Sequence, residues 1–301
     1  MSLLVTGSIG IDTVTTPIGK SENCIGGSAV YFSMAASFFS PVRFVGVVGD
    51  DCPFELSKVF AGRDVDLAGL ETRSGSKTFR WKGSYQGDMS QALTEGMQLN
   101  VLAERPPIVP DQFRKSEYVF LANTHPSLQM QLLDQLQGYK FVVADTMNCW
   151  IDSHTDELKN LLKRIDAIIL NDGEAKRLTK LDNLPSAAQE LIKMGPKLVV
   201  IKKGANGSIV LDKDGNWFML GGYPAVNLKD PTGAGDSFAG AFMGYLAAEG
   251  RTDWQFIKRA VAYGTVTASI VIEGFSLSSL SSASKSTIDK RLNELKSMTE
   301  F

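Results

Sequence analysis

The chain has 301 residues, of which 44% are hydrophobic and 21% are charged, and its formal net charge is −2. This composition is typical of a globular protein that is long enough for one large domain. It excludes the basic excess that would indicate nucleic acid as a partner, and no apolar run is long enough to span a bilayer.

Strand-like and helical patterns alternate along most of the chain. Residues 3–5 form the first predicted strand, and because no positive region precedes it, we interpret it as part of the fold and not as a signal peptide. Further strands are predicted at residues 42–48, 118–121, 141–144, 167–170 and 198–201, and helices at residues 28–39, 128–136, 156–164, 186–194, 239–248, 256–270 and 287–298. Continuous Val, Ile and Leu strands between helices predict an α/β fold with a doubly wound, mostly parallel sheet flanked by helices.

Two polar segments, residues 13–23 and 74–100, interrupt this alternation. Inserted polar strands in an α/β chain can form a small β-sheet lid over an active site, although a surface hairpin without a function fits the pattern equally well. We therefore predict a single domain over residues 1–301, with a lid built from these two segments. The serine-rich residues 276–286 are predicted to form a loop.

The lid segment contains an alternating run, in which Phe79, Trp81 and Tyr85 are interleaved with Arg80 and Lys82. The period of two in a strand places the aromatic and cationic side chains on opposite faces. One face should cover either the ligand or the lid of a second subunit in a homodimer. A cationic inner face would make Arg80 a contact for a phosphorylated or acidic ligand. We favour the aromatic face, because a covered site excludes water.

Several residues near the N-terminus are candidates for ligand binding. Asp12 follows the first strand, at the carboxyl edge where open α/β sheets bind ligands. Gly26-Gly27-Ser28 precedes the first long helix, and alone this pattern indicates only a turn and a helix start. Tyr31 lies on that apolar helix, where it could pack in the core or stack on a ligand.

Two further motifs follow strands in the second half of the chain. Asn171-Asp172-Gly173-Glu174 comes after residues 167–170 and fits a capping box, in which Asn171 caps the helix and Glu174 reaches back. Lys202-Lys203-Gly204-Ala205-Asn206-Gly207 comes after residues 198–201 and predicts a hairpin turn toward a strand at residues 208–211.

The strongest signal is Asp230-Pro231-Thr232-Gly233-Ala234-Gly235-Asp236-Ser237-Phe238, which precedes an Ala-rich helical stretch. A glycine-containing turn that opens a helix leaves backbone N–H groups unpaired at the positive helix end, and this arrangement suits a phosphate. Its small residues allow close approach to the backbone. Asp236 would then lie beside the phosphate, where a carboxylate can accept the proton of an attacking hydroxyl. Alone, Asp236 would be interpreted as a first-turn acid that only stabilises the helix.

This nine-residue string resembles the C-terminal signature of the ribokinase family, also called the phosphofructokinase-B family of carbohydrate and nucleoside kinases. The resemblance extends over essentially the whole chain, because an early Asp, a Gly-Gly pair, an Asn-x-x-Glu and a Lys-x-Gly-x-x-Gly precede the signature in order. It implies a ribokinase-like fold, ATP and Mg²⁺ as cofactors, and transfer of the γ-phosphate to a hydroxyl with Asp236 as the base.

The resemblance also implies roles for individual residues. Gly233, Ala234 and Gly235, together with Asp236, are implied to surround the transferred phosphate. Those that bind the acceptor are Asp12, Gly26, Gly27 and Ser28. Those that bind the nucleotide are Asn171, Lys202, Gly204, Asn206, Gly207 and Thr232, with an adenine pocket from residues 225–228 and 256–270. Glu174 helps to hold Mg²⁺, often through water, and this is chemically sensible because Mg²⁺ keeps waters and takes few carboxylates. One departure is Tyr31, a candidate substrate contact that stands where the family often has Asn.

These motifs favour an ATP-dependent kinase whose acceptor is a sugar hydroxymethyl group. A nucleoside is the alternative acceptor, and a non-catalytic nucleotide or sugar sensor on the same fold is the alternative class. An intact Asp236 and Glu174 argue against the sensor, which needs no base. Three scattered cysteines and two histidines argue against zinc or a Cys–His nucleophile and indicate a reducing cytoplasm. The expected partners are ATP and a small-molecule acceptor, without nucleic acid or membrane.

Overall fold

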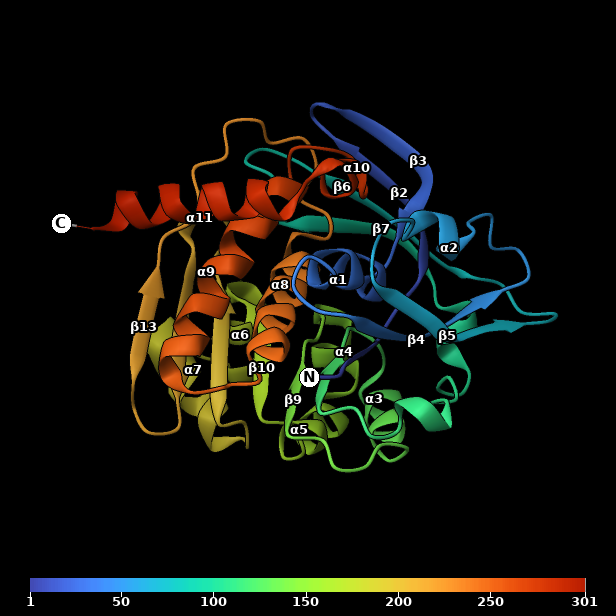
Figure 1. Cartoon of the computed structure of the whole chain (residues 1–301), viewed down its shortest axis with the longest axis horizontal. Helices are drawn as coiled ribbons and strands as arrows, with labels where there is room; N and C mark the ends of the chain where they lie inside the picture. The colour runs from blue at the N-terminus through green and yellow to red at the C-terminus, as the bar shows by residue number, and fades with distance from the viewer. Residues whose placement is uncertain (301) are drawn as a thin grey trace.

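The computed structural model describes residues 1–300 as a large central sheet with helices on both faces, joined to a smaller sheet (Figure 1). The strands of the large sheet are β1 (Leu3–Thr6), β4 (Val42–Gly49), β5 (Val65–Arg73), β8 (Tyr118–Leu121), β9 (Phe141–Ala144), β10 (Ala167–Asn171), β11 (Leu198–Lys202), β12 (Ser208–Asp212) and β13 (Trp217–Leu220). Those of the small sheet are β2 (Gly10–Thr16), β3 (Gly19–Gly26), β6 (Phe79–Tyr85) and β7 (Ala92–Gln98).

Eleven helices are described within residues 1–300. They are α1 (Ser28–Ala36), α2 (Leu56–Val59), α3 (Pro126–Leu133), α4 (Asn148–Ser153), α5 (Thr155–Leu162), α6 (Asp172–Thr179), α7 (Leu184–Lys193), α8 (Ala234–Glu249), α9 (Trp254–Val271), α10 (Ser278–Ser282) and α11 (Lys285–Thr299). Short 3-10 turns lie at Asn100–Ala103, Asp111–Phe113 and Gly204–Asn206. None of the helices in this part of the chain is both long and apolar enough to cross a membrane.

The large sheet has the strand order β13-β12-β11-β10-β9-β8-β1-β4-β5. Its strands from β11 through to β5 pair in parallel, and β12 and β13 add an antiparallel edge. The predicted doubly wound, mostly parallel sheet flanked by helices is therefore confirmed. In such a sheet the carboxyl ends of the parallel strands meet at one edge, which is where ligands bind.

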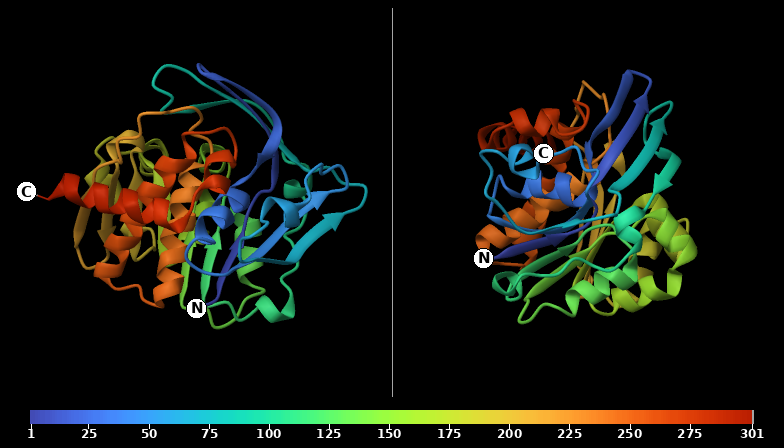
Figure 2. Two further views of the ribbon diagram at one scale, coloured as in Figure 1. Left: turned by 45° about the horizontal axis from the view of Figure 1, so that its top comes forward. Right: turned by 90° about the vertical axis from the view of Figure 1, so that its right-hand side faces the viewer.

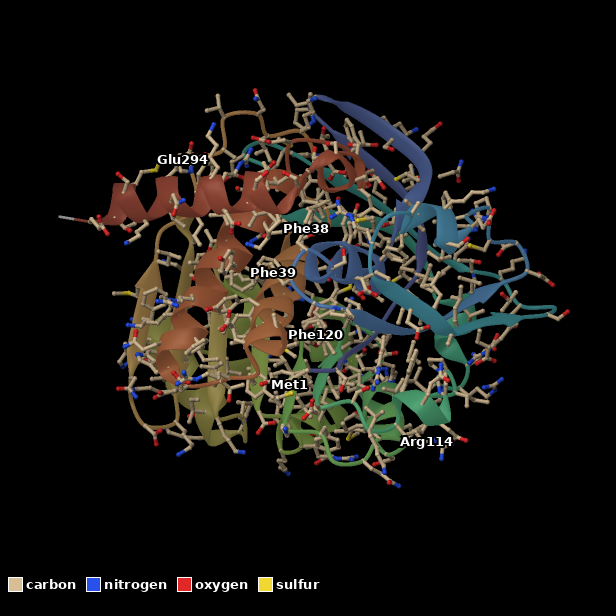
Figure 3. The ribbon with its side chains drawn as sticks, viewed as in Figure 1. Met1, Phe38, Phe39, Arg114, Phe120 and Glu294 are labelled. Carbon is tan, nitrogen blue, oxygen red and sulfur yellow. The ribbon has the colours of Figure 1, made fainter. Side chains whose placement is uncertain are left out.

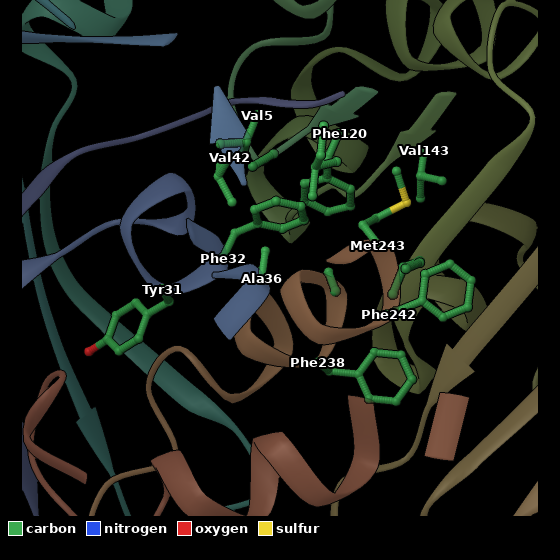
Figure 4. Packing of buried hydrophobic residues seen from close by; sticks show 14 of the residues in the cluster. Val5, Tyr31, Phe32, Ala36, Val42, Phe120, Val143, Phe238, Phe242 and Met243 are labelled. Atoms are coloured by element: carbon green, nitrogen blue, oxygen red, sulfur yellow. The ribbon is translucent and has the colours of Figure 1, made fainter. Parts of the chain in front are cut away.

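Alternate strand residues enter two separate cores. Leu3 and Val5 pack with α1, α8 and α9, whereas Leu4 packs on the opposite face with α3, α5 and α7. In the first core Phe32 of α1 stacks on Phe120 of β8 with ring centroids 4.4 Å apart (Figure 4). Because most of α8 is buried against α1, α9 and one face of the sheet, its N-terminus is held at a fixed place.

The small sheet has the order β3-β2-β6-β7 and combines strands from both of the polar segments that interrupt the sequence pattern. Strand β2 pairs antiparallel with β3 and parallel with β6, which pairs antiparallel with β7. Figure 2 shows this sheet standing beyond the edge of the large sheet. We call these four strands the lid.

Several elements were missed in the sequence, among them the strands β5 and β13 and the short helices α2, α4 and α10. Strands β5 and β13 form the two edges of the large sheet, so they are half-exposed and lack the continuous apolar run that identified the other strands. Helix α10 lies inside the serine-rich segment, where the buried Leu280 anchors a single turn. The first long helix also ends earlier than predicted, at Ala36. In the turn that follows, Phe39 (labelled in Figure 3) packs edge-on against Tyr263 of α9, with the ring centroids 4.9 Å apart.

Candidate active site

The signature loop, which we define as residues 230–236, leads into α8. The Thr232 N–H donates to Asp230 Oδ1 at 2.9 Å and fixes the turn. Gly233 has a φ of 78°, in the left-handed region that favours glycine. Helix α8 begins at Ala234, and no side chain in residues 1–300 caps it. Its first-turn amides at the positive helix end are therefore available to an anion.

Asp236 lies half-buried in the first turn of α8. Burial raises the pKa of its carboxyl, and the charge of Lys202 opposes part of that rise. Lys202 ends β11, and its Nζ lies 2.6 Å from the point that a Cβ on Gly235 would occupy. The Lys202 ammonium and the positive end of α8 repel each other, so this arrangement is favourable only if negatively charged groups lie nearby. Three carboxylates do so, those of Asp145, Glu174 and Asp236.

Asp12 brings a fourth carboxylate to this region from the lid. It is 4% exposed, and a Cβ on Gly26 would overlap its carboxylate, so the neighbouring strand needs glycine there. The Gly27 N–H donates to the Asp12 carboxylate. The Oδ1 atom of Asp12 has no hydrogen-bond partner within residues 1–300. Burial, and after it the charges of Asp236 and Asp230, raise the pKa of Asp12 to about 7. Asp12 is thus a buried acceptor group close to Asp236.

The start of α1 is fastened to the loop after β1. The Oγ atoms of Ser28 and Ser8 lie 3.0 Å apart, and the Ser28 N–H donates to Ser8 Oγ at 2.9 Å. Gly27 has a φ of 99°, and a Cβ there would overlap the Ser8 carbonyl. The predicted Gly26-Gly27-Ser28 turn and helix start is therefore present, and it holds α1 beside Asp12.

Tyr31 lies in the core, and its ring packs against Gly233 of the signature loop. It is 2% exposed, and a Cβ on Gly233 would overlap its ring. Burial, followed by the charge of Asp12, raises its pKa well above the ordinary value. Figure 4 shows its hydroxyl pointing away from the apolar cluster. Of the two alternatives for Tyr31, core packing is the one observed, and its ring is not free to stack on a ligand.

The two motifs after β10 and β11 adopt the local structures that the sequence predicts. The Asn171 N–H donates to Glu174 Oε2 at 2.8 Å, and the Glu174 N–H donates to Asn171 Oδ1 at 2.8 Å, which completes the capping box. Strands β11 and β12 form the hairpin, with Gly207 at a φ of 79° and Asn206 exposed at the turn. Glu174 and Lys202 are close enough to each other for their charges to interact.

Arg80 is a candidate that the structure does not bring to this region. Strand register places Ile11 beside Arg80 and Asp12 beside Trp81, so Arg80 lies on the lid face opposite to Asp12. Its guanidinium pairs with Asp51 at 3.0 Å, which neutralises it. The prediction of Arg80 as a substrate contact is corrected accordingly, because a paired side chain on the other face cannot clamp a ligand here.

The sequence assigned no role in this site to Asp145, and it placed Tyr85 only on the aromatic face of the lid, which we favoured as the inner face. Asp145 follows β9 and is buried beside Asp236, with an Oδ1 that has no partner within residues 1–300. Its position after a strand was the available signal. Tyr85 ends β6, and the Thr232 hydroxyl donates to its hydroxyl at 3.2 Å. A contact between residues 147 positions apart carries no signal in a single sequence.

Comparison with known proteins identifies the family. The model of the pfkB family of carbohydrate kinases matches residues 19–283. A cytidine kinase of Thermococcus kodakarensis is 29% identical over 253 residues, which cover 81% of this chain and 87% of that protein. A 5-dehydro-2-deoxygluconokinase of Photobacterium profundum is 24% identical, covering 91% of this chain and 89% of that protein.

Solved structures agree on the fold. A nucleoside kinase of Methanocaldococcus jannaschii, described as an archaeal member of the ribokinase family, superposes with a TM-score of 0.77 at 17% identity, covering 98% of this chain and 99% of that chain. An Arabidopsis thaliana ribokinase complexed with ribose and ATP gives a TM-score of 0.75 at 22% identity, covering 97% and 98%. Together with the signature loop and its buried carboxylates, these similarities lead to one conclusion: the chain belongs to the pfkB family of carbohydrate kinases.

Proposed function

We propose that this protein transfers the γ-phosphate of ATP to a hydroxyl group of a sugar or sugar derivative, with Asp236 as the catalytic base. The observation that carries the proposal is the place of Asp236 in the first turn of α8, beside the Lys202 ammonium. There the amides of the helix start bind the phosphate, and the carboxylate accepts the proton of the attacking hydroxyl. Phosphoryl transfer needs positioning and charge neutralisation more than covalent chemistry, and these groups supply both.

The two substrates approach Asp236 from different elements in this proposal. ATP lies over the ends of β10 and β11, with its γ-phosphate at the amides of residues 233–235. The residues proposed for the nucleotide are Asn171, Lys202, Gly204, Asn206, Gly207 and Thr232. The acceptor lies under the lid, where Asp12 accepts hydrogen bonds from its hydroxyls, and Gly26, Gly27 and Ser28 shape the adjoining backbone.

Glu174 is the proposed contact for Mg²⁺. No group of three or more His, Cys, Asp or Glu side chains within residues 1–300 is arranged to hold a metal ion by itself. The residues fit an ion shared with ATP, because Glu174 is a hard oxygen donor and the nearby Asp145 has a buried Oδ1 without a partner in that range. Bound there, Mg²⁺ would neutralise charge on the phosphate oxygens.

Replacing Glu174 tests this assignment. Glu174→Gln removes the charge but keeps an oxygen that can accept from the Asn171 N–H, so α6 should stay capped. We expect the Mg²⁺ concentration that gives half-maximal rate to rise about tenfold. The matched control is Asp172→Asn, which removes the same charge two residues away. An equal shift in both variants, or no shift in either, would leave Glu174 as a helix cap only.

The acceptor is either a free sugar derivative or the sugar of a nucleoside. Similarity to the 5-dehydro-2-deoxygluconokinase supports the first, and similarity to the cytidine kinase over most of both chains supports the second. The test is kcat/KM with ATP and Mg²⁺ for ribose, 5-dehydro-2-deoxygluconate, cytidine and inosine. One acceptor should exceed the others by about 10²-fold, the size of discrimination that a few lost polar contacts produce. Tight ATP binding without turnover of any acceptor would favour a sensor.

Asp12 predicts a pH dependence of acceptor binding. Its raised pKa of about 7 means that the carboxylate is lost as the pH falls through neutrality, and with it the charged acceptor of hydrogen bonds. The acceptor KM at saturating ATP should therefore rise below pH 7, by up to about tenfold per pH unit. Asp12→Asn should give a high KM that does not change in this range. A wild-type KM that stays constant from pH 8 to 5.5 would contradict the role of Asp12.

Two proposals concern the setting of the protein. A homodimer through the lid is supported by the exposed edge strand β7, in which all residues but Met97 are exposed. A cytoplasmic location is supported by three free cysteines.

A further inference from the structure

A hydrogen bond joins the lid to the signature loop. The Thr232 hydroxyl donates to the Tyr85 hydroxyl at 3.2 Å, and both side chains are partly buried. Tyr85 lies on the same lid face as Trp81 and Asp12, because β6 alternates regularly from Trp81 onward. The lid face that presents Asp12 therefore also contacts the loop that opens α8.

Both ends of this bond are held in place. On the loop side, the Thr232 N–H donates to Asp230, so the Thr232 side chain projects from a fixed turn. On the lid side, β6 is paired from Phe79 to Ser84 with β2, which carries Asp12, and Tyr85 itself is paired with Ala92 of β7. A displacement of the lid at Asp12 should therefore also displace Tyr85, and through the hydrogen bond it should displace Thr232.

The chemical state of Tyr85 suits a fixed contact. Burial, with the nearby charges of Asp230, Asp236 and Asp12, raises its pKa above the ordinary value, so the phenol keeps its proton at neutral pH. Its oxygen accepts from Thr232, which leaves the phenolic proton for a second acceptor. Neither the threonine hydroxyl nor the neutral phenol has to change its protonation state for this bond to form at neutral pH.

From these observations we propose that Tyr85 is a positioning residue that latches the lid onto the signature loop, so that lid closure over the acceptor sets the loop for phosphoryl transfer. The proposal rests on the proposed function. Tyr85 acts through Thr232, and its effect is to hold the amides of residues 233–235 in place and to keep water away from the phosphate. Acceptor binding under the lid and phosphate binding at α8 are thereby linked by one side chain.

The test compares two lid variants that each lose one side-chain hydrogen bond of the same length. Tyr85→Phe removes only the latch hydroxyl. Thr94→Val removes the hydroxyl that accepts the hydrogen bond from Trp81 Nε1–H. That bond is also 3.2 Å long, and it joins two residues of the lid. Amide hydrogen exchange of residues 233–238 is measured in the ligand-free proteins, and kcat, the KM for ATP and acceptor-independent ATP hydrolysis are measured with the best acceptor of the panel above.

Tyr85→Phe should speed exchange at residues 233–238, lower kcat about fivefold and raise the share of ATP lost to water, with the KM for ATP unchanged. Thr94→Val should change none of these. In a double-mutant cycle, Tyr85→Phe should have a smaller effect on kcat when Thr232 is already Val. The proposal is overturned if the two lid variants behave alike, or if the effects of Tyr85→Phe and Thr232→Val are additive. Wild-type transfer in the same assay reports separately on the proposed function, and the exchange experiment needs no acceptor.

Discussion

Asp236→Asn is expected to lower kcat by at least about 10²-fold while the affinity for ATP stays within a few-fold. The amide has the size of the carboxylate and can still accept a hydrogen bond from the first turn of α8, so the helix start should survive. What it loses is the capacity to take the proton of the acceptor hydroxyl. Burial raises the pKa of Asp236 and makes it a stronger base than an exposed carboxylate, which adds to the expected loss.

The matched control is Asp253→Asn. Asp253 is the N-cap residue of the adjacent helix α9 and pairs with Arg251, so it represents an acid at a helix start outside the proposed site. Its substitution should leave turnover unchanged. Steady-state kinetics with ATP titrations on both variants make the comparison. Turnover of Asp236→Asn equal to that of the wild type would remove Asp236 from the reaction.

Lys202→Met should have the second largest effect, with a fall in kcat/KM for ATP of about 10²-fold at pH 7. Burial raises the pKa of Asp236, Asp145 and Glu174, and the ammonium at the start of α8 opposes part of that rise. Without it, these carboxyls lose an opposing charge, and their pKa values rise further. Asp236 would then be protonated over a wider range, so the acid limb of the kcat profile should move to higher pH, with part of the rate recovered on the alkaline side.

Lys203→Met is the control for this substitution, because it removes the same charge one residue further along the chain. Lys203 is not among the groups that act on Asp236. The pH profile of kcat should be that of the wild type in this variant. If both substitutions lower the rate equally without moving the acid limb, then Lys202 contributes only general attraction for ATP.

Much of the fold could be predicted because buried parallel strands leave a clear pattern. Strands Ala167–Asn171 and Leu198–Lys202 are continuous apolar runs up to their last, polar residue, and both appear where the pattern placed them. The edge strands Val65–Arg73 and Trp217–Leu220 were missed, because an edge strand faces water on part of its surface and alternates less clearly.

The candidate site shows the same limit at the level of single residues. Asp236 and Glu174 stand in local motifs whose geometry follows from helix capping and helix-end electrostatics, so their positions could be argued from the sequence. Arg80 could not, because the choice between two faces of a strand depends on the register with β2, which no local pattern fixes. The contact of Tyr85 with Thr232 depends on how two sheets approach each other, and this is a property of the folded chain alone.

The most direct test of this account is the stoichiometry of transfer. The wild-type protein is incubated with γ-labelled ATP, Mg²⁺ and its best acceptor, and ADP and labelled acceptor are counted in the same samples. The account predicts one labelled acceptor for each ADP, with the phosphate on a hydroxyl oxygen of the sugar. ATP that binds tightly but yields neither ADP nor labelled acceptor, or that yields ADP with free phosphate only, would contradict it.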